Sequence, residues 1–244
     1  MEMKRPEMVI FDYGHTLVYE QDFGPLAGDI ALQPHIKTNK NALTAEQIHE
    51  RSVELSKPLA TAKKNGLEIL QTQYMRLLYE TLEIELDLSY EEAEAVFWDA
   101  AWPGEPMPGA AEMLRRLHEL GIRTAVISNI SFSQKNLKRR IDKLLPHNRF
   151  EFIMASSDYG YRKPSTHLFE LALKKSGLSP DKVWYCGDRA DMDVDGSAAV
   201  GMFPVWFEYD VSNNPFGEKK GYVPKAEYLH VSSWEEFLSI LETI

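Results

Sequence analysis

Several residues with reactive or charged side chains follow short apolar runs in this sequence of 244 residues. Asp12 follows the run MVIF, and Ser128 ends the run TAVIS. Asp188 follows VWYCG, Asp193 comes shortly after it, and Lys163 stands directly before a proline. Carboxylates bind hard divalent cations or act as nucleophiles, whereas hydroxyl and ammonium groups hold anionic oxygens. Together these residue types have the chemistry needed to handle a phosphate group.

Each of these residues has an ordinary structural explanation when it is taken alone. An aspartate or serine after a strand is usually a turn former or a helix cap, and a Lys-Pro pair is common before a helix. Their shared position changes the interpretation, because ligands of a parallel sheet bind beyond the carboxyl ends of its strands. As a set they indicate phosphoryl transfer, which depends mainly on positioning and on neutralising the charge of the transferred group.

The expected roles follow from this chemistry. Asp12 is the expected nucleophile toward phosphorus, which would give an aspartyl phosphate. Mg2+ would keep its carboxylate and a dianionic phosphate from repelling each other, with Asp188 as the other carboxylate ligand. Asp193 is expected nearby, where it orders metal-bound water or Lys163. Ser128 and Lys163 are expected to hold phosphate oxygens.

The elements that must position these residues are visible as alternating patterns from Gly109 onward. Strands are predicted at IRTAVIS, EFIMAS, KVWYCGD and MFPVWFE, with a last short strand before a C-terminal amphipathic helix. Helical patterns lie between them, which is typical of a parallel sheet with crossover helices. The predicted fold class is therefore α/β, with a doubly wound parallel-sheet, Rossmann-like core.

The first predicted strand, Met8 to Phe11, is followed by an interval far longer than an ordinary loop. The stretch LEILQTQYMRLLYETL within it has apolar residues at helical spacing. Two capping-box pairs mark helix starts there: Thr44 with Gln47 and Ser89 with Glu92. We expect residues 18–104 to form a helical cap domain, inserted into a core made of residues 1–17 and 105–244.

Composition disfavours several other classes of protein. The 37 acidic and 27 basic residues give a net charge of -10, which argues against a nucleic-acid backbone as the main partner. No segment has membrane-spanning length, and the first apolar run stops at Asp12, far short of a signal-peptide core. A single cysteine, Cys186, fits a reducing compartment. We expect a cytoplasmic protein whose partner is a small phosphorylated metabolite, with no nucleic acid and no membrane.

Four motifs, in the expected order, resemble those of the haloacid dehalogenase-like (HAD) hydrolase superfamily, in the branch with a helical cap. They are FDYGHTL around Asp12, VISN around Ser128, YRKPSTHLF around Lys163, and GDRADMDVDGSAAVGM around Asp188 and Asp193. The resemblance implies a Mg2+-dependent phosphatase that hydrolyses a small phosphate monoester through an aspartyl phosphate. It makes Asp12 the nucleophile. The resemblance further implies metal binding by Asp12, the Gly14 carbonyl, Asp188 and Asp193, and phosphate binding by Ser128, Asn129 and Lys163.

Gly14 departs from the pattern of this family. Its phosphatases usually have an aspartate there, which protonates the leaving group and later activates water. The backbone carbonyl remains for the metal, while the lost acid–base help is worth about 100- to 10,000-fold in rate. The intact GD pair at Asp188 argues against a halocarboxylate dehalogenase, and the missing aspartate argues against a mutase.

Three interpretations of Gly14 are open. In the first, which we favour, a phosphatase takes its proton from His15, from a cap residue or from water. In the second, the chain resembles phosphonoacetaldehyde hydrolase, a C–P hydrolase whose cap supplies a Schiff-base lysine. The candidate cap lysines are Lys37, Lys40, Lys57, Lys63 and Lys64. In the third, the fold serves as a non-catalytic binding or regulatory protein.

Substrate choice is expected to lie in the cap, although aromatic residues at helical spacing are more often core. The candidates are Trp98, Trp102, Tyr74, Arg76 and His35. Arg162 and Arg189 flank the motif residues and are candidates for contact with an anionic substrate. The sequence leaves the physiological substrate, the proton donor and the oligomeric state open.

Overall fold

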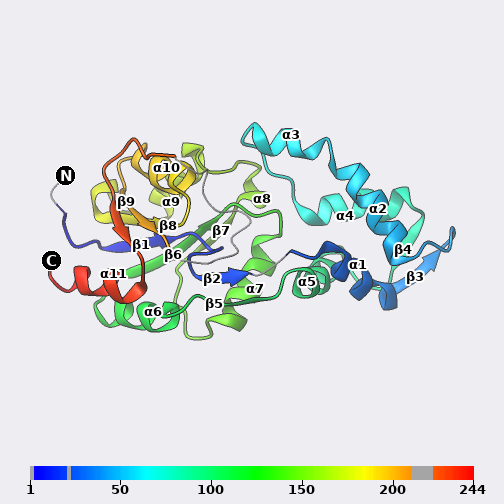
Figure 1. The fold of residues 1–244 in the computed structure, drawn as a ribbon, viewed down its shortest axis with the longest axis horizontal. Coiled ribbons are helices and arrows are strands. Elements are labelled where there is room, and N and C mark those ends of the chain that lie inside the picture. The colour runs from blue at the N-terminus through cyan, green and yellow to red at the C-terminus, as the bar shows by residue number, and fades with distance from the viewer. Residues whose placement is uncertain (1–2, 21–22, 210–221) are drawn as a thin grey trace.

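The computed structural model describes residues 3–20, 23–209 and 222–244. Within these residues, six strands form one parallel sheet (Figure 1), in the spatial order β10-β9-β8-β1-β6-β7. Their bounds are β1 (Met8–Phe11), β6 (Arg123–Ser128), β7 (Ile153–Ala155), β8 (Val183–Gly187), β9 (Phe203–Phe207) and β10 (Leu229–Val231). The predicted α/β class with a parallel sheet is confirmed.

Helices cover both faces of this sheet. On one face lie α6 (Ala110–Glu119), α7 (Gln134–Leu144) and α11 (Trp234–Leu241), and on the other α9 (Thr166–Ser176) and α10 (Asp195–Ala198), with the short α8 (Ser156–Tyr159) following β7. Val9 and Phe11 of β1 belong to the first core, whereas Met8 and Ile10 belong to the second. All four side chains are fully buried, which explains why this strand is a continuous apolar run in the sequence.

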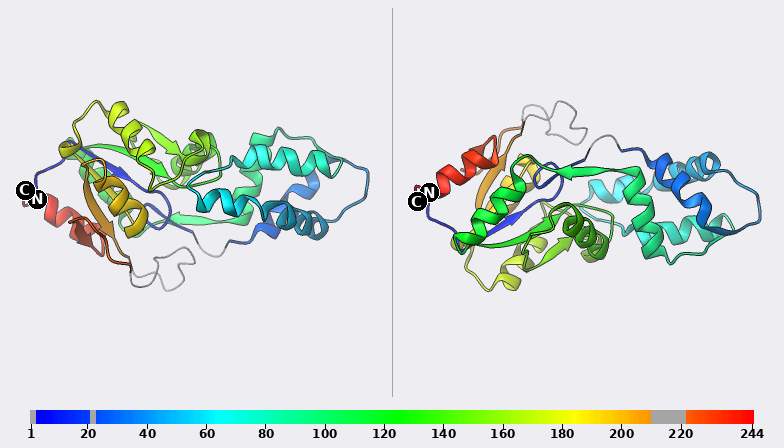
Figure 2. Two further views of the ribbon diagram at one scale, coloured as in Figure 1. Left: turned by 90° about the horizontal axis from the view of Figure 1, so that it is seen from above. Right: turned by 90° about the horizontal axis from the view of Figure 1, so that it is seen from below.

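The elements between β1 and α6 lie largely at the far end of the molecule from both termini (Figures 1 and 2). They are α1 (Pro25–Leu32), α2 (Ala45–Ser56), α3 (Leu59–Lys64), α4 (Gln71–Thr81) and α5 (Tyr90–Ala101), with the strand pairs β2 (Val18–Glu20) with β5 (Gly104–Pro106) and β3 (Ile36–Asn39) with β4 (Ile84–Leu86). The β2–β5 pair is antiparallel, and it carries both crossings of the chain between the sheet and these helices.

Local sequence signals place two of these helix starts correctly. Thr44 and Ser89 both form the predicted capping boxes, at the starts of α2 and α5. The helical pattern that begins at Leu67 was wrong at its start, because α4 begins only at Gln71. Leu67 instead forms an antiparallel bridge with Tyr161, between α8 and α9. Tertiary pairing with the core therefore overrides local helical preference in residues 67–70.

A buried arginine on α7 contacts both places where the chain crosses between the sheet and these helices, at β2 and next to β5. The Nε of Arg140 donates to the hydroxyl of Tyr13 at 2.8 Å, and its Nη2 lies 3.0 Å from Glu20 Oε1 on β2. The same Nη2 donates to the carbonyl of Trp102, next to β5. Arg140 is 3% exposed, so this network lies in the interior.

Among the described residues, no helix is both long enough and apolar enough to cross a bilayer.

Candidate active site

A cavity of about 580 Å3 lies beyond the carboxyl ends of β1, β6 and β8, and its outer wall comes from α2, α3, α4 and α5. All the motif residues singled out from the sequence line it: Asp12, Gly14, Ser128, Asn129, Lys163, Asp188 and Asp193. The strands bring them together because β1 lies between β6 and β8 in the sheet. This is the edge where an open parallel sheet is expected to bind its ligands.

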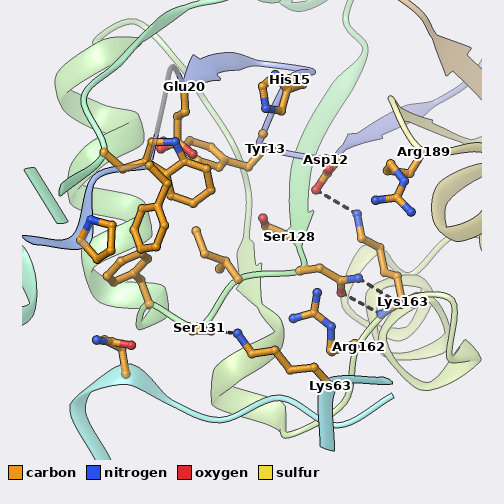
Figure 3. Close-up of a pocket in the computed structure, with 18 of the residues that line it drawn as sticks. Asp12, Tyr13, His15, Glu20, Lys63, Ser128, Ser131, Arg162, Lys163 and Arg189 are labelled. Atoms are coloured by element: carbon orange, nitrogen blue, oxygen red, sulfur yellow. Dashed lines mark hydrogen bonds and ion pairs between the residues drawn. The ribbon is translucent and has the colours of Figure 1, made fainter. Parts of the chain in front are cut away.

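The ammonium group of Lys163 joins two of the carboxylates. Its Nζ lies 2.8 Å from Asp12 Oδ1 and 2.6 Å from Asp193 Oδ1 (Figure 3 marks the first of these contacts). It also donates to the hydroxyl of Tyr185 at 2.8 Å and to the carbonyl of Ile127 at 3.2 Å. Burial by itself lowers the pKa of Lys163, but Asp12 and Asp193 outweigh burial and raise it. The side chain is therefore a fixed positive charge beside Asp12.

Three carboxylate side chains lie close together at this end of the sheet. Oxygens of Asp12, Asp188 and Asp193 lie within 4.8 Å of one another. Burial, followed by the charges of Asp12 and Asp193, raises the pKa of Asp188 well above its usual range. Burial also raises the pKa of Asp193 to about 6, although Lys163 opposes that rise. Because carboxylate oxygens are preferred ligands of Mg2+ and a cation would relieve this repulsion, the cluster fits such a metal.

The position of Asp193 depends on the backbone around it. Its Oδ2 accepts a hydrogen bond from the backbone N–H of Arg189 at 3.0 Å. Gly187, the last residue of β8, packs so closely that a Cβ there would collide with the Asp193 side chain. A glycine at the end of β8 is therefore required for this carboxylate to reach Lys163.

Ser128 and Asn129 follow one another at the end of β6 but make different contacts. Ser128 is buried, and Figure 3 shows it between Asp12 and Arg162 on the cavity wall. The Oδ1 of Asn129 accepts from the Lys163 N–H at 2.8 Å, and its Nδ2 donates to the Lys163 carbonyl at 3.0 Å. The side-chain amide of Asn129 thus fixes the loop that carries Lys163. Phosphate binding by Ser128 and Asn129 stays a prediction.

Gly14 and His15 occupy the turn after β1. A Cβ built on Gly14 would meet nothing within 4 Å, so the space for a side chain there is open. His15 has a φ of 53°, and neither ring nitrogen has a hydrogen-bond partner among the described residues. Burial lowers the pKa of His15 to about 4. The ring is therefore neutral at neutral pH, and it cannot donate a proton as an imidazolium ion there.

Only some of the residues predicted to select the substrate line the cavity. Tyr74 and Trp102 line the cavity, whereas His35 and Arg76 do not. Trp98 is fully buried in the hydrophobic core. Sequence periodicity could not separate these cases, because it identifies an apolar face without showing what that face packs against.

Sequence reasoning missed polar residues beside the cavity that connect the loop between α3 and α4 to the loops after β6 and β7. Glu68, whose carboxylate accepts a hydrogen bond from Ser131 at 3.1 Å, was not singled out at all. Lys63 was named only as one of several cap lysines, although it lines the cavity. A bridge between Leu67 and Tyr161 places these residues, and no local motif in the sequence signals that bridge.

A sequence model of the haloacid dehalogenase-like hydrolases matches residues 7–201. The chain belongs to this family. The match includes every motif residue from Asp12 to Asp193, and it confirms the family expected from the four motifs.

Two relatives and one solved structure describe the likeness further. The chain is 28% identical to the glyceraldehyde 3-phosphate phosphatase of Pyrococcus furiosus, over 98% of the chain and 95% of that protein. It is 35% identical to the protein of the same name from Pyrococcus abyssi, over 42% of each. The 2-haloacid dehalogenase of Pseudomonas syringae matches with a TM-score of 0.62 at 18% identity, covering 97% of this chain and 98% of that one. At that identity the last likeness shows a common fold alone.

Proposed function

We propose that this member of the family is a Mg2+-dependent phosphatase that hydrolyses small phosphate monoesters through an aspartyl phosphate on Asp12. The observation that carries the proposal is the meeting of Asp12, Lys163 and Asp193 in ion-pair contact on the wall of one cavity. The names of the two archaeal relatives support the reaction class.

Asp12, Lys163 and Ser128 have separate roles in the proposed reaction. A carboxylate oxygen of Asp12 attacks phosphorus, the bond from phosphorus to the ester oxygen breaks, and the leaving oxygen takes a proton from solvent. Lys163 offsets negative charge on the transferred group, and Ser128 donates a hydrogen bond to it. Water then attacks the same phosphorus, which returns the Asp12 carboxylate and releases inorganic phosphate.

Metal binding is assigned to groups that surround the carboxylate cluster. Asp12, Asp188 and the backbone carbonyl of Gly14 would hold Mg2+, and Asp193 would support the site. A bound Mg2+ would offset the repulsion between carboxylates and phosphate and polarise the phosphoryl oxygens. The raised pKa of Asp188 supports this assignment, because burial and the charges of Asp12 and Asp193 disfavour its ionised form, which a bound cation would stabilise.

Residues 18–104 are proposed to act as the cap and residues 1–17 and 105–244 as the core. The cap side of the cavity carries Tyr74, Phe97 and Trp102, so substrate selection is assigned to that side. Because the relatives are named for glyceraldehyde 3-phosphate, phosphorylated three-carbon compounds are the first substrates to test. The buried free thiol of Cys186 supports a reducing compartment such as the cytoplasm.

A second candidate function, hydrolysis of a C–P bond through a Schiff base, has one observation in its favour. Of the five cap lysines, all within the part of the chain that the structure describes, Lys63 alone lines the cavity. Burial, and then the charge of Arg162, lowers its pKa to about 8. Borohydride reduction in the presence of phosphonoacetaldehyde would attach the substrate to Lys63 if this function were correct.

Phosphate release from p-nitrophenyl phosphate and glyceraldehyde 3-phosphate tests the phosphatase proposal. The wild-type protein is compared with Asp12→Asn, each with Mg2+ and with EDTA. Turnover that requires both Mg2+ and Asp12 is the expected result. Folded wild-type protein that binds Mg2+ but releases phosphate no faster than Asp12→Asn would overturn the proposal and favour the C–P or the non-catalytic alternative.

A further inference from the structure

Two cationic side chains from opposite parts of the chain meet on one wall of the cavity. Lys63 comes from the last turn of α3 in the cap, and Arg162 comes from the core loop just before Lys163. Both line the same cavity as Asp12. Figure 3 shows them on the far side of Ser128 from Asp12, with the Lys63 amine directed toward Ser131. They therefore lie in the same cavity as the proposed phosphate site, on the other side of Ser128 from Asp12.

A single carboxylate balances these two cations. Glu68 forms an ion pair with Arg162, and its Oε1 lies 3.6 Å from the Lys63 Nζ. The same carboxylate also accepts hydrogen bonds from Ser131 at 3.1 Å and from Ser156 at 3.2 Å. Its side chain has no exposed surface, and Glu68 is not among the residues that line the cavity. Glu68 carries one negative charge against the two positive charges of Lys63 and Arg162, so these three side chains have a net positive charge.

The two cationic side chains are buried to different extents, with Arg162 18% exposed and Lys63 43% exposed. Desolvation, followed by the charge of Arg189, lowers the pKa of Arg162. Desolvation, followed by the charge of Arg162, also lowers the pKa of Lys63. An anion between them would interact favourably with both positive charges and offset the repulsion by which Arg162 lowers the pKa of Lys63. The Lys63 side chain is 43% exposed and held by one hydrogen bond, at 2.8 Å to Ser131, so it can turn to such an anion.

We propose that Lys63 and Arg162 form a subsite for a second anionic group of the substrate, a carboxylate or a second phosphate, while the reacting phosphate sits at Asp12. This inference rests on the proposed phosphatase function. A fork-shaped guanidinium beside an ammonium group is well suited to either anion. Because Lys63 belongs to the cap, such a substrate would also tie the cap to the core.

Matched substrates and a matched variant test the subsite. The substrate pairs are 3-phosphoglycerate with glycerol 3-phosphate, and propane-1,3-diol bisphosphate with 3-hydroxypropyl phosphate. The variant is Lys63→Gln, and the control is Lys64→Gln, which changes the neighbouring residue of the same helix outside the cavity lining. We expect Lys63→Gln to lower kcat/KM on the substrates with a second anion by about 10- to 100-fold, the worth of a charge-assisted hydrogen bond. Lys64→Gln should leave it unchanged.

The two pairs separate the sources of the second anion. A loss confined to 3-phosphoglycerate identifies a carboxylate subsite, and a loss confined to the bisphosphate identifies a second phosphate. Equal losses on both members of each pair, or no loss on any, would overturn the subsite. Binding of the same compounds to Asp12→Asn by calorimetry gives a second readout that needs no turnover. A preference for the second anion that Lys63→Gln removes would support the subsite even if the phosphatase proposal failed, and its absence would refute the subsite.

Discussion

Restoring a carboxyl group at position 14 should raise the rate of this enzyme. A Cβ at Gly14 meets nothing within 4 Å, and the φ of this residue lies outside the left-handed region. The Cβ of an aspartate at position 14 therefore meets no neighbouring atom and needs no strained backbone. The new side chain would stand two residues after Asp12, on the turn that lines the cavity. It would supply the proton donor that the turn now lacks.

The size of the effect follows from the chemistry of the leaving group. General acid catalysis is worth about 100- to 10,000-fold, or roughly 2.7 to 5.5 kcal/mol of transition-state stabilisation. Asp12, Asp188 and Asp193 lie close together near this turn, so repulsion should raise the pKa of the added carboxyl group and favour its acid form. An alkyl phosphate, with its poor leaving group, should gain the most. An aryl phosphate needs little protonation and should gain little.

The assay compares kcat/KM, which reports the transfer of phosphate to Asp12, for glycerol 3-phosphate and for p-nitrophenyl phosphate in wild type, Gly14→Asp and Gly14→Asn. The asparagine variant has the same shape but cannot donate a carboxyl proton. We expect a gain of at least 100-fold on the alkyl phosphate in Gly14→Asp and none in Gly14→Asn. Equal effects of Asp and Asn, or no gain in a folded protein that still binds Mg2+, would show that the missing carboxyl group does not limit this enzyme.

Three further changes test the contacts that hold the site together. Lys163→Met should abolish measurable turnover and lower the free energy of unfolding by about 3 to 5 kcal/mol in urea titrations, because it leaves buried Asp193 without its cation. Arg140→Met should lower the free energy of unfolding by about 3 kcal/mol, because it leaves the buried Glu20 carboxylate without its cation. Arg139→Met is the control: its ion pair with Asp99 is partly exposed, so this change should lower the free energy of unfolding by less than about 1 kcal/mol. His15→Asn should change the pH dependence of stability. His15 takes up a proton below pH 6.5 in the unfolded state but only below about pH 4 in the folded state, so acid favours unfolding. Between pH 7 and pH 4 the free energy of unfolding should therefore fall by on the order of 3 kcal/mol more in wild type than in His15→Asn. Losses of equal size in Arg139→Met and Arg140→Met, or parallel pH curves for wild type and His15→Asn, would contradict these assignments.

The strands and the catalytic cluster could be predicted because their signals are local. The β1 run MVIF is buried on both faces, which makes it continuously apolar in the sequence. Asp12 and Asp188 follow such runs directly, and β1 pairs with β8 so that their ends coincide. The glycine of the GD pair has a physical cause that the sequence only hinted at, since a side chain at Gly187 would collide with Asp193.

The wall that faces the substrate could not be predicted in the same way. Lys63 and Glu68 reach Arg162 only because residues 67–70 leave the helical pattern and pair with the core near Gly160. That pairing depends on contacts between parts of the chain that are distant in sequence. The pKa of His15 likewise depends on burial, which its position beside Gly14 does not reveal.

A covalent phosphoryl group on Asp12 is the most direct observable for this reaction. The enzyme is mixed with p-nitrophenyl phosphate, whose leaving group needs little protonation, and with Mg2+, quenched in acid within the first turnovers, and digested for mass spectrometry. Because Gly14 provides no base to activate the attacking water, the aspartyl phosphate should accumulate on the peptide that contains Asp12. It should be absent with EDTA and in Asp12→Asn. Steady Mg2+-dependent phosphate release with no phosphoryl group on that peptide, and no initial burst, would contradict nucleophilic attack by Asp12.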